Sequence, residues 1–288
     1  MLVVDAVFDN LRLDKFLCKK FDISFGLAQK LIREKKVKLN GKNCDSANKI
    51  KTQDQIEILA SLKPRFEKEK ARISDERFKK FSKLIIFEDD NLIAIDKPSG
   101  FATQGGSGIE ISVDDFARSK NYQLVHRLDK DTSGILLIAK NKNCADFLTE
   151  KFKNKTIKKT YLALLSGNLK KEFTRINIPL LKKIQGKNEK VFPDFENGKE
   201  AITLLKLIKN FTDFALVEFS PLTGRTHQLR VHAKEIGHAI INDFKYGGQK
   251  VMRKNLCKRL CLHASKIEID DYFNKKLTIK TKLPEFYQ

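Results

Sequence analysis

The chain has 288 residues, of which 41% are hydrophobic and 32% are charged. These are the proportions of a globular protein with a core, and the length suits one large or two modest domains. No apolar run approaches the roughly 18 residues of a membrane-spanning helix, and the first residues do not resemble a secretory signal. Of the five cysteines, Cys257 and Cys261 are separated by three residues and no second pair matches them, which argues against a disulfide framework or a structural zinc site. We therefore expect a cytoplasmic protein with free thiols and no membrane partner.

The formal net charge is +21 at pH 7. Such an imbalance favours a polyanionic partner, because each phosphate contact releases counterions. The basic excess is carried mainly by lysine, so a general enrichment in lysine is the alternative explanation. Charge alone therefore indicates a nucleic-acid partner without establishing one.

Residues 1–62 are predicted to form a small unit that begins with two helices. Leu13, Phe16 and Leu17 have the spacing of an apolar helical stripe. Ser24 is expected to cap a second helix. The apolar face of that helix comprises Leu27, Ala28, Leu31 and Ile32.

Strands are predicted to complete this unit. Residues 37–39 alternate and lead into the tight-turn pair Asn40-Gly41, and residues 56–59 alternate again. Over RLDKFL, AQKLIREKKVKLNGK and DQIEIL the unit resembles an S4-type RNA-binding domain; a generic small α/β cap domain is the alternative. The resemblance implies RNA contacts from the basic residues at the end of the second helix, which are Lys30, Arg33, Lys35 and Lys36. The family often has glycine where this chain has Lys35-Lys36, and glycine suits a left-handed helix end.

Residues 63–83 are predicted to be a basic linker. They contain nine Lys or Arg against four Asp or Glu, with few apolar residues and one proline. A segment of this composition does not bury enough apolar surface to fold alone. Two interpretations stay open: the linker becomes ordered on RNA, or it is only a solvated tether.

From residue 84 onward, short apolar runs recur with turns or loops between many of them. The predicted strands are 84–87, 92–95, 135–139, 161–165, 202–208, 214–219, 267–269 and 277–279. Helices are predicted at 112–119, 143–154 and 226–236. Because a helix does not follow every strand, we expect the α+β class, with residues 84–288 forming one domain on a mixed, largely antiparallel sheet.

The most informative stretch is 126–134, His-Arg-Leu-Asp-Lys-Asp-Thr-Ser-Gly, followed by the apolar run 135–139. A carboxylate at the mouth of a buried strand is a common way to hold a reactive group rigidly. The plain alternative is a polar turn between two strands. The stretch resembles the signature of the pseudouridine synthases of the large-subunit ribosomal RNA family, and Asp129 matches their essential aspartate. The resemblance also implies that Arg127 helps to fill the space left by a flipped base, and it makes His126 a candidate substrate-binding residue.

Three further stretches resemble elements of the same family. Lys-Pro-Ser-Gly at 97–100 matches an element beside the active-site cleft. Lys-Thr-Tyr-Leu-Ala-Leu at 159–164 supplies Tyr161, which the resemblance places on the face of the target base; a core tyrosine is the alternative. Leu262, in Leu-His-Ala, matches the late motif that lines the uracil pocket.

Residues 223–232, Thr-Gly-Arg-Thr-His-Gln-Leu-Arg-Val-His, form the second strong signature. The family places an arginine here in an ion pair with the catalytic aspartate. We assign that role to Arg225, with Arg230 as second choice, since a nearby cation favours the charged form of a carboxylate. The two histidines lie five apart, whereas helical metal ligands are normally three or four apart, so no metal site is expected.

The reaction implied by the resemblance breaks the bond from ribose C1′ to uracil N1 and remakes it at C5. One carboxylate suffices, because the base itself returns as the acceptor, and no cofactor or metal is required. We interpret Asp131 as a turn residue. The resemblance extends over nearly the whole chain and favours the C-type subgroup over the D-type subgroup. It implies a monomer acting on 23S rRNA or a pre-ribosomal large-subunit particle; the uridines, and whether Asp129 acts as nucleophile or base, stay open.

Two other classes of protein are alternatives to a catalytic isomerase. A non-catalytic S4 RNA-binding protein would not need the set formed by Asp129, Tyr161 and Arg225. An S4-linked RNA methyltransferase would need a glycine-rich strand–turn–helix for its cofactor, and the sequence contains none. The run Gly-Gly-Ser-Gly at 105–108 is neither a P-loop nor a dinucleotide fingerprint. A catalytic isomerase therefore remains the preferred interpretation.

Overall fold

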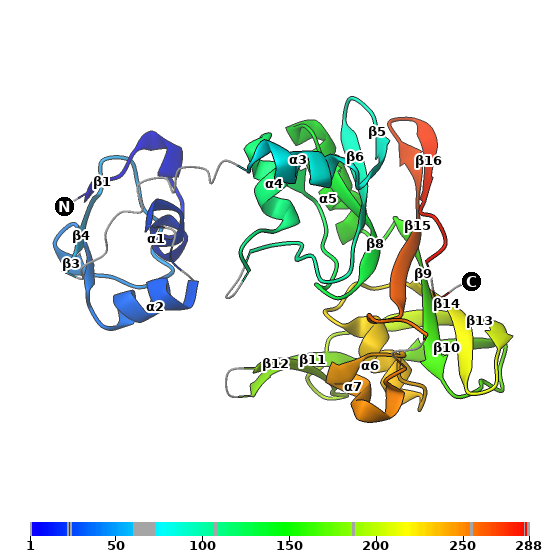
Figure 1. Ribbon diagram of the computed structural model, residues 1–288. Helices are drawn as coiled ribbons and strands as arrows, with labels where there is room; N and C mark the ends of the chain where they lie inside the picture. The colour runs from blue at the N-terminus through cyan, green and yellow to red at the C-terminus, as the bar shows by residue number, and fades with distance from the viewer. Residues whose placement is uncertain are drawn as a thin grey trace. The chain divides into compact units, whose positions relative to one another are not determined.

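The computed structural model describes residues 2–21, 23, 25–59, 73–105, 109–185, 188–253, 256–284 and 286. The chain forms two compact units, Met1–Arg72 and Ile73–Gln288 (Figure 1). Helices and sheets are mixed without a regular strand–helix alternation, which confirms the predicted α+β class. Among the described residues, no helix is long and apolar enough to cross a membrane.

The first unit contains a four-stranded antiparallel sheet with the order β1-β4-β2-β3, and its helices share one core. Its elements are β1 (Leu2–Val3), η1 (Ala6–Phe8), α1 (Leu13–Phe21), α2 (Phe25–Arg33), β2 (Val37–Leu39), β3 (Lys42–Asn43) and β4 (Gln55–Ile58). The stripe predicted for the first helix is buried, as are Ala28, Leu31 and Ile32 of the second, whereas Leu27 is exposed. The predicted cap Ser24 lies outside the described residues.

Helix α2 ends in a left-handed turn at Lys35. Lys35 has a φ of +56°. Its N–H donates to the carbonyl of Ile32, and the N–H of Lys36 donates to the carbonyl of Leu31, both at 2.9 Å. This pair of bonds is the Schellman arrangement, in which glycine is preferred because a Cβ is crowded in left-handed backbone. The departure from glycine noted in the sequence therefore falls on the one residue that needs this conformation.

Replacing Lys35 with glycine is expected to stabilise the first unit. Relief of the crowded backbone should outweigh the extra chain entropy of glycine, for a net gain of about 0.5–1 kcal/mol in the free energy of unfolding. Urea unfolding followed by circular dichroism would measure the gain. Lys36→Gly is the matched control, because Lys36 is not left-handed, and it should not gain stability. Equal changes in both variants would contradict this account of the turn.

The second unit is built on a ten-stranded sheet with the main order β10-β13-β14-β9-β15-β8-β6-β5, where β16 also pairs with β15 and β7 with β8. Only β8 and β15 are parallel, so the sheet is mixed and largely antiparallel, as predicted. The strands are β5 (Ile85–Glu88), β6 (Leu92–Lys97), β7 (Gln123–Leu124), β8 (Ser133–Ala139), β9 (Lys158–Ser166), β10 (Phe173–Asn177), β13 (Ile202–Asn210), β14 (Phe214–Pro221), β15 (Leu262–Tyr272) and β16 (Lys275–Lys280).

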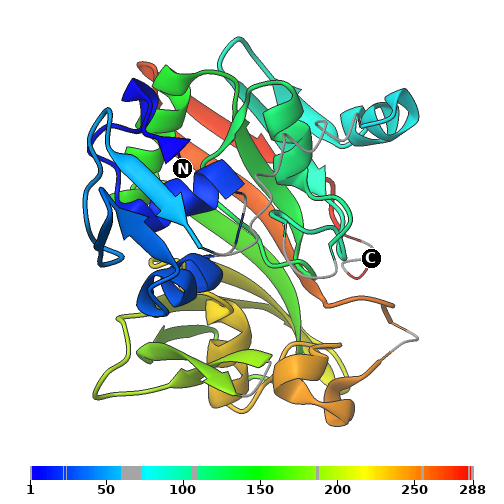
Figure 2. The same ribbon diagram turned by 90° about the vertical axis from the view of Figure 1, so that its left-hand side faces the viewer.

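Helices accompany the two halves of this sheet (Figure 1). They are α3 (Asp75–Ser82), α4 (Val113–Ser119), α5 (Lys142–Lys153), α6 (Gln228–Glu235), α7 (Phe244–Gly247) and η2 (Gln249–Val251). Helices α3, α4 and α5 lie beside the half that contains β6 and β8, and α6 and α7 lie beside the half that contains β13 and β14. The long strands β9 and β15 run side by side through the middle of the unit (Figure 2). A loop that enters β8 can therefore face α6 across this middle region.

Helix α3 lies inside the segment predicted to be a linker. Ser74 caps it by accepting a hydrogen bond from the N–H of Arg77. Phe81 is buried, and its ring stacks on Phe116 of α4 with centroids 4.3 Å apart. The basic composition concealed this apolar surface, and the boundary between the two units falls at Arg72 instead. Residues 63–72 of the predicted linker lie outside the described residues.

A separate hairpin, β11 (Leu180–Gln185) with β12 (Asn188–Pro193), was not predicted. Its apolar residues are interrupted by lysines, so neither strand has a clear alternating pattern. Val191 of β12 is buried in a small cluster with Val231 of α6 and Tyr246 of α7. The hairpin is thus attached to the two helices that border the middle of the unit.

Gly134 is where the parallel strands β8 and β15 approach most closely. It has a φ of +110°, and a Cβ at this position would lie 2.2 Å from the carbonyl oxygen of Ala264. Neither the conformation nor the space admits a side chain. The last residue of the signature 126–134 therefore fixes how closely β8 approaches β15, just beyond the loop that holds Asp129.

Candidate active site

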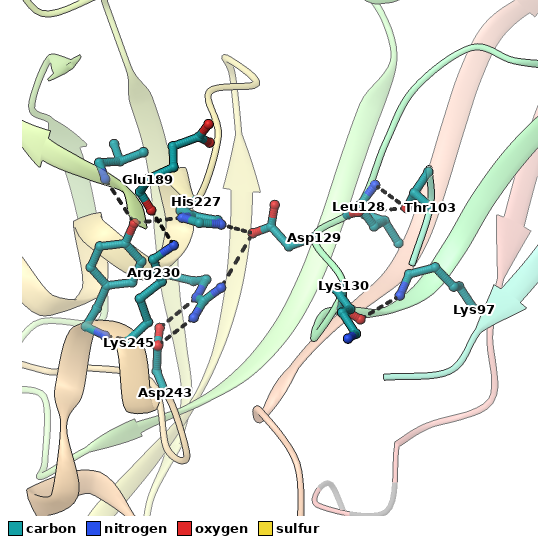
Figure 3. Close-up of polar contacts among 12 residues, drawn as sticks. Lys97, Thr103, Leu128, Asp129, Lys130, Glu189, His227, Arg230, Asp243 and Lys245 are labelled. Carbon is teal, nitrogen blue, oxygen red and sulfur yellow. Dashed lines mark hydrogen bonds and ion pairs between the residues drawn. The ribbon is translucent and has the colours of Figure 1, made fainter. Parts of the chain in front are cut away.

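Asp129 lies on the loop between β7 and β8, and about one-fifth of its side chain is exposed. Figure 3 shows its carboxylate directed toward His227 and Arg230. The backbone on either side of Asp129 is held by hydrogen bonds from Thr103 and Lys97. The loop turns at Asp129, whose carbonyl accepts a hydrogen bond from the N–H of Thr132 at 3.1 Å. The site thus consists of a backbone clamp on one side and charged side chains on the other.

Lys97 is the centre of the clamp. Its side chain is fully buried, and Nζ donates to the carbonyls of Pro98, Phe101 and Lys130 at 3.1, 2.7 and 3.0 Å. Burial lowers the pKa of this amine to about 8, although the charges of Asp131 and Asp129 oppose the shift. Three carbonyls offset the burial of the ammonium, and one of them belongs to the residue after Asp129. The Lys-Pro-Ser-Gly element therefore anchors the loop that holds Asp129.

Further hydrogen bonds fix the same loop. The hydroxyl of Thr103 donates to the carbonyl of Leu128 at 2.7 Å and accepts from its N–H at 3.3 Å (Figure 3). The hydroxyl of Ser99 donates to the carbonyl of Asp131 at 2.6 Å. The side chain of Asp131 is exposed, and the turn is closed by the Asp129 carbonyl.

His126 anchors the start of the loop. Its Nε2 accepts a hydrogen bond from the N–H of Leu137 at 2.9 Å, and its ring stacks on Phe152 with centroids 4.6 Å apart. Burial, assisted by the charge of Lys159, lowers the pKa of this imidazole to about 3. The ring is therefore neutral at physiological pH and cannot serve as a cationic RNA contact.

Arg230 of α6 and His227, the residue before α6, face the carboxylate of Asp129. Arg230 Nη1 lies 3.9 Å and His227 Nε2 lies 3.8 Å from Asp129 Oδ2. Arg230 also binds the buried Asp243 through two parallel hydrogen bonds of 2.8 and 2.7 Å. This bidentate pair holds the guanidinium in one orientation, so a positive charge is fixed beside Asp129.

The predicted partner of Asp129 is not where the sequence interpretation placed it. Arg225, the first choice, is exposed, and its Nε donates to the carbonyl of Glu200 at 2.9 Å. Arg230, the second choice, occupies the position beside the carboxylate. The turn before α6 directs the side chain of Arg225 toward Glu200, just before β13. The side chain of Arg230 lies on the face of α6 that is turned toward Asp129.

A cleft of about 520 Å³ opens above these residues. Its walls include all the residues that the sequence proposed in this unit, namely His126, Arg127, Asp129, Tyr161, Arg225, Arg230 and Leu262. Tyr161 stands half-buried on β9, and burial together with the charge of Asp129 raises the pKa of its hydroxyl. The exposed Arg127 lies at the wall beside Asp129. The volume is in the range of pockets that bind small organic ligands, so a flipped nucleotide can be accommodated.

The basic residues proposed in the first unit separate into two pairs. Arg33 and Lys35 line a shallow groove of about 370 Å³. Lys30 and Lys36 form ion pairs with Glu34, at 3.7 and 2.8 Å. All are at the C-terminal end of α2 or just beyond it.

The two histidines of the second signature do not form a metal site. His232 is directed elsewhere, with Nδ1 2.9 Å from the Thr203 hydroxyl and Nε2 3.0 Å from the carbonyl of Ile178. In the described part of the chain, no group of three or more His, Cys, Asp or Glu side chains is arranged to hold a metal ion.

Several residues of the site carried no assigned role in the sequence interpretation: Lys97, Thr103, His227, Asp243 and Tyr246. The available signal for His227 was its distance of three positions from Arg230, because residues three apart lie on one face of a helix. Asp243 and Tyr246 come from a distant segment, and only the tertiary fold brings them to α6.

Comparison with known sequences agrees with this geometry. Residues 91–235 match the RNA pseudouridylate synthase family, and residues 11–56 match the S4 domain. The chain therefore belongs to the RNA pseudouridylate synthase family, whose members are isomerases. The predicted family and the predicted S4 domain are both confirmed.

Among curated relatives, ribosomal large subunit pseudouridine synthase C of Rickettsia felis is 39% identical, with 96% of this chain and 94% of that protein aligned. The proteins of the same name from Buchnera aphidicola subsp. Schizaphis graminum and Vibrio parahaemolyticus are 35% and 33% identical, covering 97% of this chain and 92% or 93% of theirs.

Two solved human structures are similar to this chain in fold. Human RNA pseudouridylate synthase domain containing 1 is 26% identical, with a TM-score of 0.60, and the match covers 69% of this chain and 83% of that one. Human RNA pseudouridylate synthase domain containing 4 is 24% identical, with a TM-score of 0.59, and the match covers 73% and 92%.

Proposed function

We propose that the chain converts specific uridines of 23S ribosomal RNA to pseudouridine, with Asp129 as the reacting carboxylate. The observation that supports this most is the position of Asp129 in a cleft between Tyr161 and the cation of Arg230. The names of the bacterial relatives, all large-subunit enzymes of type C, support the substrate class.

The proposed reaction begins with a uridine flipped into the cleft. Flipping costs a few kcal/mol of lost stacking, and an aromatic face such as Tyr161 returns about 1–3 kcal/mol. Arg127 then fills the space that the base leaves in the RNA. Lys153, Lys155 and Lys159 also line the cleft and suit the phosphates of the flipped nucleotide.

The chemistry needs no atom from outside the RNA except exchangeable protons. The C1′–N1 bond breaks with its electron pair going to N1, the uracil turns, and C5 forms the new bond to C1′. The proton on C5 is then lost and N1 ends protonated. Asp129 drives the cleavage either as a nucleophile at C1′ or as the base of an elimination-type path. The cation of Arg230 compensates the negative charge that develops during the reaction.

We further propose that the enzyme works as a monomer in the cytoplasm, on free 23S rRNA or on an assembling large-subunit particle. Chemical mapping of pseudouridine in 23S rRNA from cells with and without the gene tests this function. Loss of modification at particular uridines is expected. Loss of modification at the uridines of the related D-type enzyme would assign that specificity instead. An unchanged map would contradict 23S rRNA as the substrate.

The S4-like unit is expected to supply RNA affinity rather than chemistry. A variant that starts at Ile73 keeps α3 and every residue of the cleft, and it loses 17 Lys or Arg and 10 Asp or Glu, a net charge of +7. Each lost phosphate contact should flatten the plot of log affinity against log salt by roughly 0.7–0.9.

Binding to rRNA fragments at several salt concentrations measures this effect. The shortened enzyme should bind more weakly, with a shallower slope, and still turn over at high RNA concentration. Equal affinity and equal slope for the full chain and the shortened enzyme would show that the S4-like unit does not bind this RNA. A folded variant without activity at saturation would show that the unit completes the catalytic site.

A further inference from the structure

His227 lies between Asp129 and Tyr246. Its backbone is left-handed, with φ +53°, at the residue before α6. Its two ring nitrogens face different partners. Nε2 is 3.8 Å from Asp129 Oδ2 (Figure 3), and Nδ1 is 2.7 Å from the hydroxyl of Tyr246. Non-glycine residues in this conformation cost of order 1–3 kcal/mol and are retained where the surroundings demand them.

The surroundings of His227 favour the neutral form of its ring. Burial lowers its pKa, the cations of Arg230 and Lys245 add to the shift, and the carboxylates of Asp129 and Asp243 oppose it. A neutral imidazole carries one proton, so one nitrogen donates and the other accepts. Nε2 is the nitrogen that faces Asp129. Whether Nε2 carries the proton depends on the hydrogen bond that Nδ1 makes on the other side of the ring.

Tyr246 decides between the two forms. Its oxygen already accepts a hydrogen bond from the N–H of Val191 at 3.2 Å. Within the described part of the chain, the only acceptor in reach of its own O–H is Nδ1 of His227. Since a buried hydroxyl seldom leaves its proton unused, Tyr246 donates to Nδ1 and the proton of the imidazole resides on Nε2. That N–H is the group directed at the carboxylate.

The partner of Tyr246 belongs to the β11–β12 hairpin. Val191 lies on β12, and the ammonium of Lys245 donates to the carbonyl of Glu189 on the same strand at 2.6 Å. Helix α7 is therefore attached to the hairpin backbone on both sides of Lys190. A chain of contacts runs from this strand through Tyr246 and His227 to Asp129.

We propose that His227 is a positioning residue for Asp129, that Tyr246 fixes it as the Nε2–H tautomer, and that the β11–β12 hairpin holds this arrangement through the amide of Val191. The inference rests on the proposed function only in taking Asp129 as the reacting carboxylate. The separation of 3.8 Å is longer than a hydrogen bond, and such contacts tighten when substrate closes the site. The Nε2–H then orients one carboxylate oxygen and leaves the other for the ribose.

The tautomer is measured directly by NMR of protein labelled with ¹⁵N-histidine. The wild type should carry the proton of His227 on Nε2, and Tyr246→Phe should shift the ring toward a mixture of the two forms. Tyr272→Phe is the matched control, because its hydroxyl binds Asp89 outside the cleft. A wild-type proton on Nδ1, or a tautomer unchanged in Tyr246→Phe, would overturn the inference.

Kinetics separate positioning from a merely structural role. Release of tritium from 23S rRNA transcribed with [5-³H]uridine reports the loss of the C5 proton. Tyr246→Phe should lower kcat about 10- to 100-fold, the order expected for a misoriented catalytic group, with KM changed less than about twofold. Tyr272→Phe should stay near wild type in both constants. A Tyr246→Phe enzyme with wild-type kcat would contradict the proposal.

A second pair of variants does not depend on Tyr246. Glutamine can place an N–H where Nε2 of His227 lies, whereas asparagine can place one only where Nδ1 lies. His227→Gln should therefore retain about tenfold more kcat than His227→Asn, and equal losses would count against the tautomer. If Asp129→Asn were active, the proposed function would fail on that result alone, while the NMR measurement would still judge the tautomer.

Discussion

Asp129→Asn is expected to fold like the wild type and to lose essentially all isomerisation. Among the described residues, the carboxylate of Asp129 makes no hydrogen bond, and its nearest charged partners, His227 and Arg230, are 3.8 and 3.9 Å away. Asparagine can therefore take its place without leaving a partner unsatisfied. The amide can neither attack C1′ nor remove a ribose proton. We expect the rate to fall by at least about 10³-fold, equivalent to about 4 kcal/mol of barrier.

Tritium release from labelled 23S rRNA under single-turnover conditions measures this loss, and circular dichroism checks the fold. Asp131→Asn is the matched control, since its exposed carboxylate is on the same loop two residues later. The control should stay within a few-fold of wild type. An Asp129→Asn enzyme that retained more than about 1% of the wild-type rate, a loss below about 2.7 kcal/mol, would remove Asp129 as the reacting group.

Arg230→Met is expected to destabilise the second unit and to inactivate it. The substitution leaves the carboxylate of Asp243, which is fully buried, without its cation. Breaking a buried ion pair from one side costs about 3–5 kcal/mol. It also removes the positive charge beside Asp129, which the proposed mechanism needs independently of stability.

The double variant Arg230→Met/Asp243→Asn separates these two effects. Asparagine keeps the side-chain acceptor that caps α7 at the N–H of Tyr246 and removes the unpaired charge, so most of the lost stability should return in urea unfolding. Activity should not return. A double variant that is both stable and active would show that Arg230 only supports the fold, and a fully stable single variant would show that the pair does not hold α6 to α7.

The sequence identified the turn at Asp129 and the strand that follows it, because the information for both is local. The run 126–134 contains the carboxylate, the turn and the glycine, and all of them act within one loop and the start of one strand. Helix periodicity and apolar runs likewise identified α4, α5, α6 and most strands of the large sheet. The hairpin β11–β12 was missed because its lysines break the alternation, and α3 was missed because basic composition outweighed Phe78 and Phe81.

The arginine assignment failed for a different reason. Arg225 and Arg230 lie in one signature, and the sequence does not reveal the left-handed residue at His227 that separates their directions. Counting along α6 would have favoured Arg230, because it shares a helix face with His227. Its anchor Asp243 lies 13 residues further along the chain in another segment, and no local pattern connects the two.

The place of β15 in the sheet has a consequence for when the enzyme becomes active. This strand pairs with β8 on one side and β9 on the other, and it begins only at Leu262. During synthesis the earlier strands leave the ribosome first. In the described sheet, β15 lies between β8 and β9, so the half that carries Asp129 and the half that carries Arg230 remain unjoined until Leu262–Tyr272 inserts between them. The carboxylate of Asp129 and the guanidinium of Arg230 are therefore brought together late in folding, after the strands β8 and β9 on either side of β15 have been made.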